Sequence, residues 1–212
     1  MTEDEIRPAD FMAEQAERHQ RDAAWLLARS DQFVRVPCPA CGKTKKECAV
    51  EKDGFSFHTC LDCGTVYVSP RPPPDLLAEF LTASESYAFW CERIFPASEA
   101  VRREKIVRPR AKALLRICED LGIIRGMLVE VGAGFGTFCE EVRALDGFRQ
   151  VIAVEPTPQL AAACRSRGLR TIELPIEQVD GTSLRADVVA SFEVIEHVFS
   201  PADFFARCRG IL

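Results

Sequence analysis

The sequence predicts an α/β protein in which a helix and a small metal-binding module precede a parallel β-sheet. After Gly126, four short apolar segments rich in β-branched residues (MLVEV, VIAVE, TIEL and ADVVASF) alternate with helical segments. Strands that alternate with helices build parallel sheets, and the lack of polar alternation fits strands that are buried on both faces. Further upstream, two Cys-x-x-Cys pairs indicate a module that is held together by a metal ion.

The composition bounds the class of protein. The chain has 212 residues, of which 47% are hydrophobic, and a formal net charge of −5. The hydrophobic share is that of a globular protein, and no apolar run reaches the ~20 residues that cross a bilayer. The acidic balance argues against nucleic acid as a partner, because phosphate binding needs a basic surplus. The start, MTEDEIRPAD, lacks the hydrophobic segment of a secretory signal, so we expect a cytoplasmic protein.

The N-terminal part of the chain is predicted to be helical. Residues 8–33 form one expected amphipathic helix, because apolar residues such as Phe11 and Leu26 recur at helical spacing between charged residues. The run from Ser69 to Pro74 is predicted to be a stiff linker, since its prolines cannot continue a helix or a central strand.

Two helical segments follow this linker. Asp75 is expected to cap the helix DLLAEFLTA. A second helical region runs from about Ala97 to Leu121. We expect Pro109 to interrupt it, because a proline inside a helix lacks the N–H that the helix needs.

The two cysteine pairs predict a structural zinc site. Each pair is followed by a glycine, as CPACG and CLDCG, and eighteen residues separate the pairs, which is a zinc-ribbon spacing. Four thiolates complete a tetrahedron and leave no open position, so the Zn²⁺ would hold the fold rather than catalyse. The predicted ligands are Cys38, Cys41, Cys60 and Cys63. Replacement of one ligand by Cys48 or His58, and a module without metal, remain alternatives.

The other six cysteines are scattered, mostly within apolar or helical stretches, and are expected to be small buried hydrophobic residues. They are Cys48, Cys91, Cys118, Cys139, Cys164 and Cys208. Lys43, Lys45 and Lys46 lie near the first pair, but nearby acids offset them, so a solvated loop is the favoured interpretation over nucleic-acid binding.

The glycine-rich segment EVGAGFG, residues 130–136, follows the first predicted strand and opens a helix, where a ligand can approach the backbone closely. A dinucleotide fingerprint requires a third glycine at the position of Thr137. Glu130, within the strand, repels a pyrophosphate and attracts a ligand that carries an ammonium and a sulfonium. Glu155, at the end of the second strand, can accept both hydroxyls of an adenosine ribose.

Residues 127–212 resemble the class I S-adenosylmethionine-dependent methyltransferases, which have a Rossmann-like sheet. EVGAGFG resembles their first motif, VEP their second, and FEVIEHV a segment after the fourth strand. The two cysteine pairs upstream of VYVSPRP further resemble bacterial methyltransferases with an N-terminal zinc ribbon, several of them associated with sugar or surface-polysaccharide modification. The resemblance implies an enzyme that methylates a small molecule or a sugar or polysaccharide precursor.

The resemblance also implies roles for individual residues. Glu130 and the glycine loop would face the methionine part of S-adenosylmethionine, Glu155 its ribose and Pro156 its adenine, while Phe192 would line the cleft. The residues implied to bind the cofactor are Glu130, Gly132, Ala133, Gly134, Gly136, Glu155, Pro156, Ile176, Glu177, Phe192 and Glu193.

Glu193, Glu196 and His197 form an E-x-x-E-H pattern that places them on neighbouring turns if the segment is helical. The pattern resembles the divalent-metal ligands of ubiquinone-pathway O-methyltransferases and small-RNA 3′-end methyltransferases. We favour an ordinary strand-to-helix connection without metal. His197 is the candidate catalytic residue, as a general base.

Four regions are therefore expected: an N-terminal helix in residues 1–34, a zinc ribbon in 35–70, a linker with helices in 71–126 and the methyltransferase core in 127–212. The chain ends after the fourth strand of a family sheet that has seven. We expect a truncated chain, or a partner or second copy that covers the edge of that strand. A zinc-ribbon nucleic-acid methyltransferase, a nicotinamide oxidoreductase and a cofactor-binding scaffold without activity of its own remain alternative functions.

Overall fold

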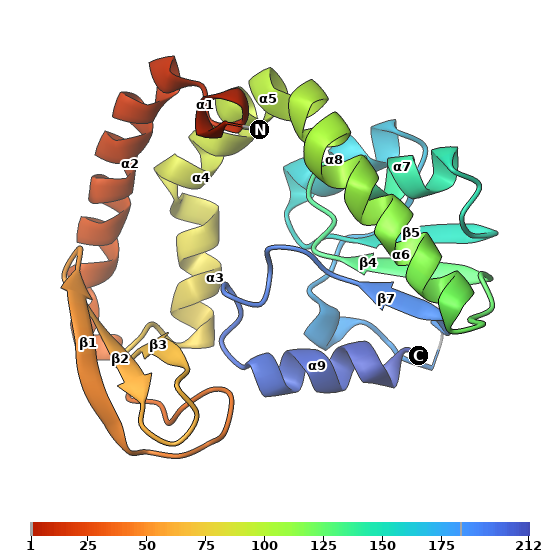
Figure 1. Ribbon diagram of the computed structural model, residues 1–212. Helices are drawn as coiled ribbons and strands as arrows, with labels where there is room; N and C mark the ends of the chain where they lie inside the picture. Colours follow the sequence, from red (N-terminus) through yellow and green to blue (C-terminus); the bar gives the residue numbers. More distant parts are fainter. Residues whose placement is uncertain (1, 183) are drawn as a thin grey trace. The chain divides into compact units, whose positions relative to one another are not determined.

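The computed structural model describes residues 2–182 and 184–212, and it divides the chain into two compact units, Met1–Glu99 and Ala100–Leu212. Figure 1 shows the elements of both units. The boundary falls within helix α5, Phe95–Arg102. Among the described residues, none of the helices combines the length and the hydrophobicity that a membrane-spanning helix requires.

The first unit begins with helices α1 (Glu3–Ile6) and α2 (Ala9–Leu27). The expected single helix over 8–33 is therefore too long: a 3₁₀ turn at Ser30–Gln32 replaces its end, because serine and aspartate compete for backbone hydrogen bonds and favour turns. Helix α3 (Pro74–Ala83) begins one residue before Asp75, since proline at the first helical position has no N–H to leave unsatisfied. Helix α4 (Glu85–Phe89) continues into a π-helical turn, Trp90–Ile94.

A buried carboxylate connects α2 to α4. The side chain of Asp22 accepts hydrogen bonds from the hydroxyl of Ser84 at 2.7 Å and from the backbone N–H groups of Glu85 at 2.9 Å and Ser86 at 3.0 Å. Although burial by itself raises the pKa of Asp22, the hydrogen bonds from Ser86 and Ser84 lower it. Asp22 thus caps the N-terminus of α4 from a separate helix.

The segment that holds the two cysteine pairs contains a three-stranded antiparallel sheet in the order β1-β2-β3. Its strands are β1 (Lys46–Lys52), β2 (Phe55–Cys60) and β3 (Val66–Val68). Cys48 lies on β1, nearly all of which is exposed, so the expectation that Cys48 is buried is wrong. Cys91 is partly buried, and the other four scattered cysteines are buried as expected.

The helix that precedes the second sheet continues through Pro109, contrary to the expected interruption. A π-helical turn, Arg103–Val107, leads directly into α6, Arg108–Asp120. Pro109 lies in the first turn of α6, next to a wider turn that absorbs the missing N–H bond and the bulk of the ring. The helical path is therefore kept.

The second unit contains the predicted parallel sheet, in the order β6-β5-β4-β7. In chain order its elements are β4 (Met127–Val131), α7 (Thr137–Ala144), β5 (Gln150–Val154), α8 (Pro158–Ser166), β6 (Arg170–Ile172), a 3₁₀ turn (Ile176–Gln178), β7 (Val188–Ala190) and α9 (Pro201–Gly210). Because β5 and β7 lie on opposite sides of β4, the chain reverses direction across the sheet at β4, where open α/β sheets bind ligands.

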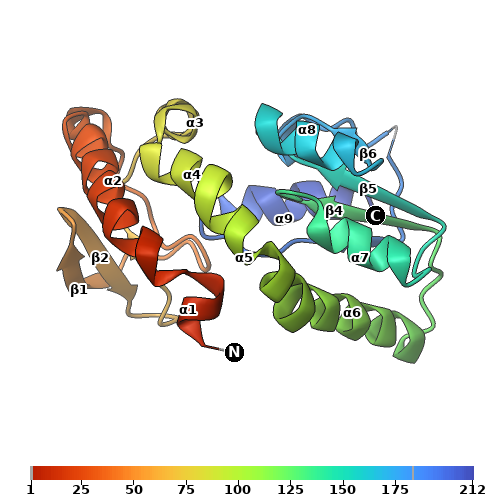
Figure 2. The same ribbon diagram turned by 90° about the horizontal axis from the view of Figure 1, so that it is seen from above.

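Two apolar layers enclose this sheet. Buried residues of α6 and α7 pack on one face, including Ala111 and Val142, whereas Phe204 and Ile211 in and after α9 pack on the other. In Figure 2, α9 lies behind the sheet, whereas α7 lies in front of it and α6 lies below α7 in the view. Strands buried on both faces explain the continuous apolar segments of the sequence.

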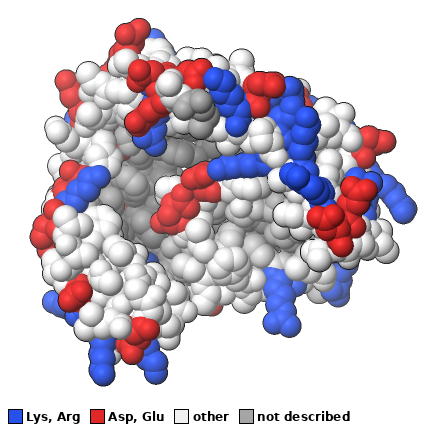
Figure 3. Space-filling model, in the orientation of Figure 1, with Lys and Arg blue, Asp and Glu red and all other residues white. Residues whose placement is uncertain are grey.

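Ion pairs hold α6 against α7. Glu141 is 5% exposed, and its carboxylate accepts hydrogen bonds from Arg103 and from Arg108, each at 2.9 Å. The hydrogen bond from Arg108 lowers the pKa of Glu141. On the face drawn in Figure 3, acidic and basic side chains lie intermixed.

Candidate functional site

The four cysteines of the two pairs meet at one point. The Sγ atoms of Cys38 and Cys63 are 3.6 Å apart, as are those of Cys41 and Cys60, and all four lie within 4.8 Å of one another. Four sulfurs around a zinc ion at Zn–S ≈ 2.3 Å are about 3.8 Å apart, so the spacing fits this ion.

The two cysteine turns have the same backbone geometry. In each turn the glycine after the second cysteine has a positive φ, 71° at Gly42 and 76° at Gly64. The N–H of that glycine donates to the carbonyl of the first cysteine of its pair, at 2.9 Å in both turns. Only glycine adopts this conformation at no steric cost, which explains its place after each pair.

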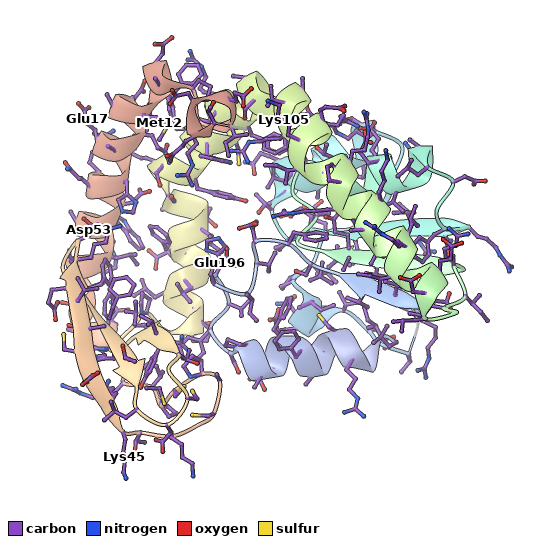
Figure 4. The ribbon with its side chains drawn as sticks, viewed as in Figure 1. Met12, Glu17, Lys45, Asp53, Lys105 and Glu196 are labelled. Atoms are coloured by element: carbon purple, nitrogen blue, oxygen red, sulfur yellow. The ribbon has the colours of Figure 1, made fainter. Side chains whose placement is uncertain are left out.

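The four-cysteine cluster is half buried. Cys38 and Cys60 are each 1% exposed, whereas Cys41 and Cys63 are exposed. The hydroxyl of Thr65, 3.3 Å from the Sγ of Cys63, lowers the pKa of Cys63 to about 6. A thiolate at neutral pH is the form that binds zinc. Lys45, labelled in Figure 4, lies just ahead of β1.

The glycine loop lies at the carboxyl end of β4, and its three glycines serve different purposes. Gly132, Gly134 and Gly136 all have a positive φ, between 56° and 75°. A Cβ on Gly132 would overlap the side chain of Val194, and one on Gly136 would overlap that of Leu169. A Cβ on Gly134 would meet no atom within 4 Å, so this glycine faces open space where a ligand can approach.

Backbone hydrogen bonds fix the loop to the neighbouring strand. The carbonyl of Val154, the last residue of β5, accepts from the N–H of Gly132 at 2.8 Å and from that of Ala133 at 3.2 Å. Ala133 is buried. The loop is therefore preformed, which lowers the entropic cost of binding a ligand.

Glu155 directly follows β5 and is 4% exposed. One of its carboxylate oxygens accepts from the N–H of Gly134 at 2.8 Å, and the other accepts from the N–H of Thr157 at 2.9 Å. Burial raises the pKa of Glu155, although both hydrogen bonds oppose the shift. Because a carboxylate oxygen has two lone pairs, each oxygen can accept one hydroxyl more.

Glu130 lies on β4, beneath the loop, and is also 4% exposed. The thiol of Cys139, on α7, donates to its carboxylate at 3.0 Å. Burial raises the pKa of Glu130 to about 8, and the negative charge of Glu155 adds to the shift. At neutral pH the carboxyl group is therefore mostly protonated until a cation lies close to it.

The loop after β7 lies on the other side of β4 from β5, at the place where the chain reverses direction across the sheet. Phe192 packs on Phe138 of α7, with 4.7 Å between the ring centroids. The hydroxyl of Ser191 donates to the carbonyl of Val131, the last residue of β4, at 2.9 Å. Glu193 has a φ of 56°, which costs a non-glycine residue roughly 1–2 kcal/mol. This turn brings Val194 onto Gly132.

The E-x-x-E-H segment is a turn, so its side chains do not share a helical face. Helix α9 begins only at Pro201, and the hydroxyl of Ser200 caps it. Glu193, Glu196 and His197 are exposed, and Figure 4 labels Glu196 on this loop. Within the described residues, the four zinc-module cysteines form the one cluster of side chains that could hold a metal ion.

The remaining residues implied to bind the cofactor lie in different surroundings. Pro156 is exposed at the end of β5. Ile176 is 4% exposed and packs into the core beneath the sheet. Glu177 is exposed and lines a shallow surface depression together with Asp203 and Arg207.

Four residues at this site escaped the sequence analysis. Cys139 was expected only to fill space, yet it donates to Glu130. Thr157 donates to Glu155, two residues earlier in the chain, whereas Val194 and Arg110 contact site residues through tertiary structure. For the contact between Cys139 and Glu130 the sequence offered one signal: Cys139 lies nine residues after Glu130, in the first turn of the helix that follows the glycine loop.

Comparisons with known proteins agree with this geometry. Residues 129–212 match the family model described as "Methyltransferase domain". The chain is similar to the ubiquinone biosynthesis O-methyltransferase of Rhodopseudomonas palustris strain BisB18, with 33% identity over 103 residues, which are 45% of this chain and 39% of that protein. It is 28% identical over 158 residues to that of strain HaA2, covering 68% of this chain and 60% of the relative. The chain therefore spans less than two thirds of the length of these relatives.

Solved structures with partial similarity include a sugar-modifying enzyme from Micromonospora echinaspora. That enzyme, an amino pentose methyltransferase with bound S-adenosylmethionine, gives a TM-score of 0.46 at 22% identity, over 53% of this chain and 48% of its own. A sugar N-methyltransferase from a Streptoalloteichus species gives a TM-score of 0.45 at 17% identity, over 53% of this chain and 45% of its own.

Proposed function

We propose that this chain, whose residues 129–212 match a methyltransferase-domain family, is a class I S-adenosylmethionine-dependent methyltransferase that transfers a methyl group from S-adenosylmethionine to a small molecule. The observation that carries the proposal is the set of groups around Gly134. Its α-carbon faces open space, and the buried carboxylate of Glu155 accepts its N–H. A second buried carboxyl group, on Glu130, lies beneath the same loop. The carboxylate of Glu155 beside Gly134 disfavours a diphosphate, and the two buried carboxyl groups together suit a cationic ligand with ribose hydroxyls.

Each residue of the candidate cofactor site has its own role in binding S-adenosylmethionine. Glu155 accepts the ribose hydroxyls with its remaining lone pairs, and Glu130 becomes charged when an ammonium group approaches the loop. Phe192 forms an apolar wall opposite the loop and excludes water. S-adenosylmethionine supplies a methyl group on a sulfonium, which is already a good leaving group, so the chain contributes mainly position. His197, exposed on the loop after β7, is the proposed base for the acceptor's proton.

The proposed acceptor is a sugar or a polysaccharide precursor. The arrangement of cysteine pairs ahead of VYVSPRP supports it, because bacterial methyltransferases with such a zinc ribbon include several that act in sugar modification. We propose that the four cysteines bind one Zn²⁺ that stabilises the fold and takes no part in methyl transfer.

The test is methyl transfer to a panel of nucleotide sugars and amino sugars, followed as release of S-adenosylhomocysteine and as methylated product by mass spectrometry. We expect His197→Ala to lower turnover without changing the affinity for S-adenosylhomocysteine. His19→Ala, which changes an exposed histidine of α2, is the matched control and should behave as the unchanged chain. Cofactor binding without transfer to any acceptor would instead identify a cofactor-binding scaffold.

A further inference from the structure

Arg110 lies on α6, outside the glycine loop, yet it contacts both residues at the start of the loop after β7. Its guanidinium carbon is 5.0 Å from the centre of the Phe192 ring. One of its Nη atoms donates to the carboxylate of Glu193 at 2.7 Å. A planar guanidinium can stack on a ring with its face and bind a carboxylate with its edge at the same time, which an ammonium group cannot do.

The two residues that Arg110 contacts determine the shape of the candidate cofactor site. Phe192 packs on Phe138, in the helix that the glycine loop opens. Glu193 holds the unfavourable positive φ that turns the chain, so that Val194 lies against Gly132. A contact from Arg110 therefore acts on the one non-glycine residue of this loop whose backbone has a positive φ.

We propose that Arg110 is a positioning residue of the cofactor site: it holds the turn from Phe192 to Val194 against the glycine loop before the cofactor binds. This inference rests on the proposed function, since it assigns the loop to the cofactor. Released from Arg110, Glu193 leaves the left-handed conformation for part of the time. The affinity for the cofactor then falls by the fraction of chains that retain the competent turn.

The same geometry separates this role from a contribution to global stability. The side chains of Arg110 and Glu193 are 37% and 70% exposed, and exposed ion pairs add little to the free energy of unfolding. A loss of the pair should therefore change binding and local order while the melting temperature stays nearly constant.

The experiment uses the full chain and compares Arg110→Ala with Arg116→Ala, which removes an exposed arginine of the same helix. Calorimetry with S-adenosylhomocysteine should show affinity that is weaker by about 2- to 5-fold in Arg110→Ala, which is the range that loss of an exposed ion pair allows, and unchanged in Arg116→Ala. The conservative variant Arg110→Lys should lie between. In the ligand-free chain, hydrogen exchange of residues 191–199 should be faster in Arg110→Ala alone.

A double-mutant cycle tests whether Arg110 affects cofactor binding through Glu193. In a Glu193→Ala background, Arg110→Ala should weaken binding less than it does in the unchanged chain, because only the contact with Phe192 is then left to lose. Equal affinity of Arg110→Ala and the unchanged chain, or a fall in melting temperature beyond about 5 °C, would overturn the positioning role. If the unchanged chain does not bind S-adenosylhomocysteine, the proposed function fails, while the exchange rates still decide whether Arg110 orders the turn.

Discussion

The N–H of Gly134 donates a hydrogen bond of 2.8 Å to the carboxylate of Glu155, which connects the glycine loop after β4 to the end of β5. The loop after β4 and the residue after β5, at the carboxyl ends of adjacent parallel strands, are thus fixed to each other. The bond places a buried carboxylate beside the one loop glycine whose α-carbon faces open space. The cofactor assignment depends on this relationship.

Gly134→Ala should weaken binding of S-adenosylhomocysteine by tenfold or so while the chain stays folded. The new methyl group contacts no protein atom within 4 Å, so it meets only the approaching ligand. Its cost to folding is the backbone strain of a positive φ, roughly 1–2 kcal/mol. Calorimetry and thermal unfolding measure the two effects separately.

The matched control for that change is Gly132→Ala, at another glycine of the loop with positive φ. Its methyl group would overlap Val194, so we expect a larger loss of stability than for Gly134→Ala. If both variants melt at the same temperature and bind equally, the distinction between the two glycines is wrong.

Glu130→Gln should make the chain more resistant to alkaline pH. Burial raises the pKa of Glu130 from 4.5 to about 8, so the unfolded chain ionises this group first. Between these pH values the folded state binds more protons, and the free energy of unfolding falls as pH rises, by roughly 5 kcal/mol at most. Glutamine cannot ionise, and its amide oxygen can still accept from Cys139.

The readout is the melting temperature of both chains from pH 5 to pH 9, with Glu119→Gln, at an exposed position of α6, as the control. The unchanged chain and the control should lose stability more steeply with pH than Glu130→Gln does. Parallel profiles of all three proteins would show that Glu130 is ionised throughout.

Cys60→Ser should remove the metal from the first unit and unfold its small sheet. Cys60 is 1% exposed and at the end of β2, and structural zinc supplies on the order of 10 kcal/mol to such modules. Cys48→Ser makes the same chemical change at an exposed cysteine of β1. Metal analysis should return one zinc per chain for Cys48→Ser and for the unchanged chain. Full zinc content in Cys60→Ser would contradict the ligand set.

Features that short sequence patterns encode were predicted correctly. The apolar segments predicted the parallel strands correctly, because strands that are buried on both faces are continuous runs of hydrophobic residues. The two cysteine turns were visible because a glycine with positive φ must follow each pair, at Gly42 and Gly64. The sequence pattern alone left open whether E-x-x-E-H is helical; the segment is a turn, and Ser200 and Pro201 carry the signal for a helix that begins later.

Features that depend on tertiary contact could not be predicted from the sequence. Arg110 and Glu193 are 83 residues apart in the chain, and only the fold brings them to 2.7 Å. The high pKa of Glu130 depends on its depth beneath the loop, which a strand pattern does not report. The path through Pro109 depends on a π-helical turn, for which no sequence pattern was recognised.

The most direct test is calorimetry of the unchanged chain with S-adenosylhomocysteine and, separately, with NAD. We predict that one S-adenosylhomocysteine binds per chain and that NAD does not bind. We further predict that Glu155→Ala loses most of this affinity, whereas Glu119→Ala, at an exposed glutamate, keeps it. Binding of NAD in place of S-adenosylhomocysteine, or equal affinity in Glu155→Ala, would contradict the assignment of this loop.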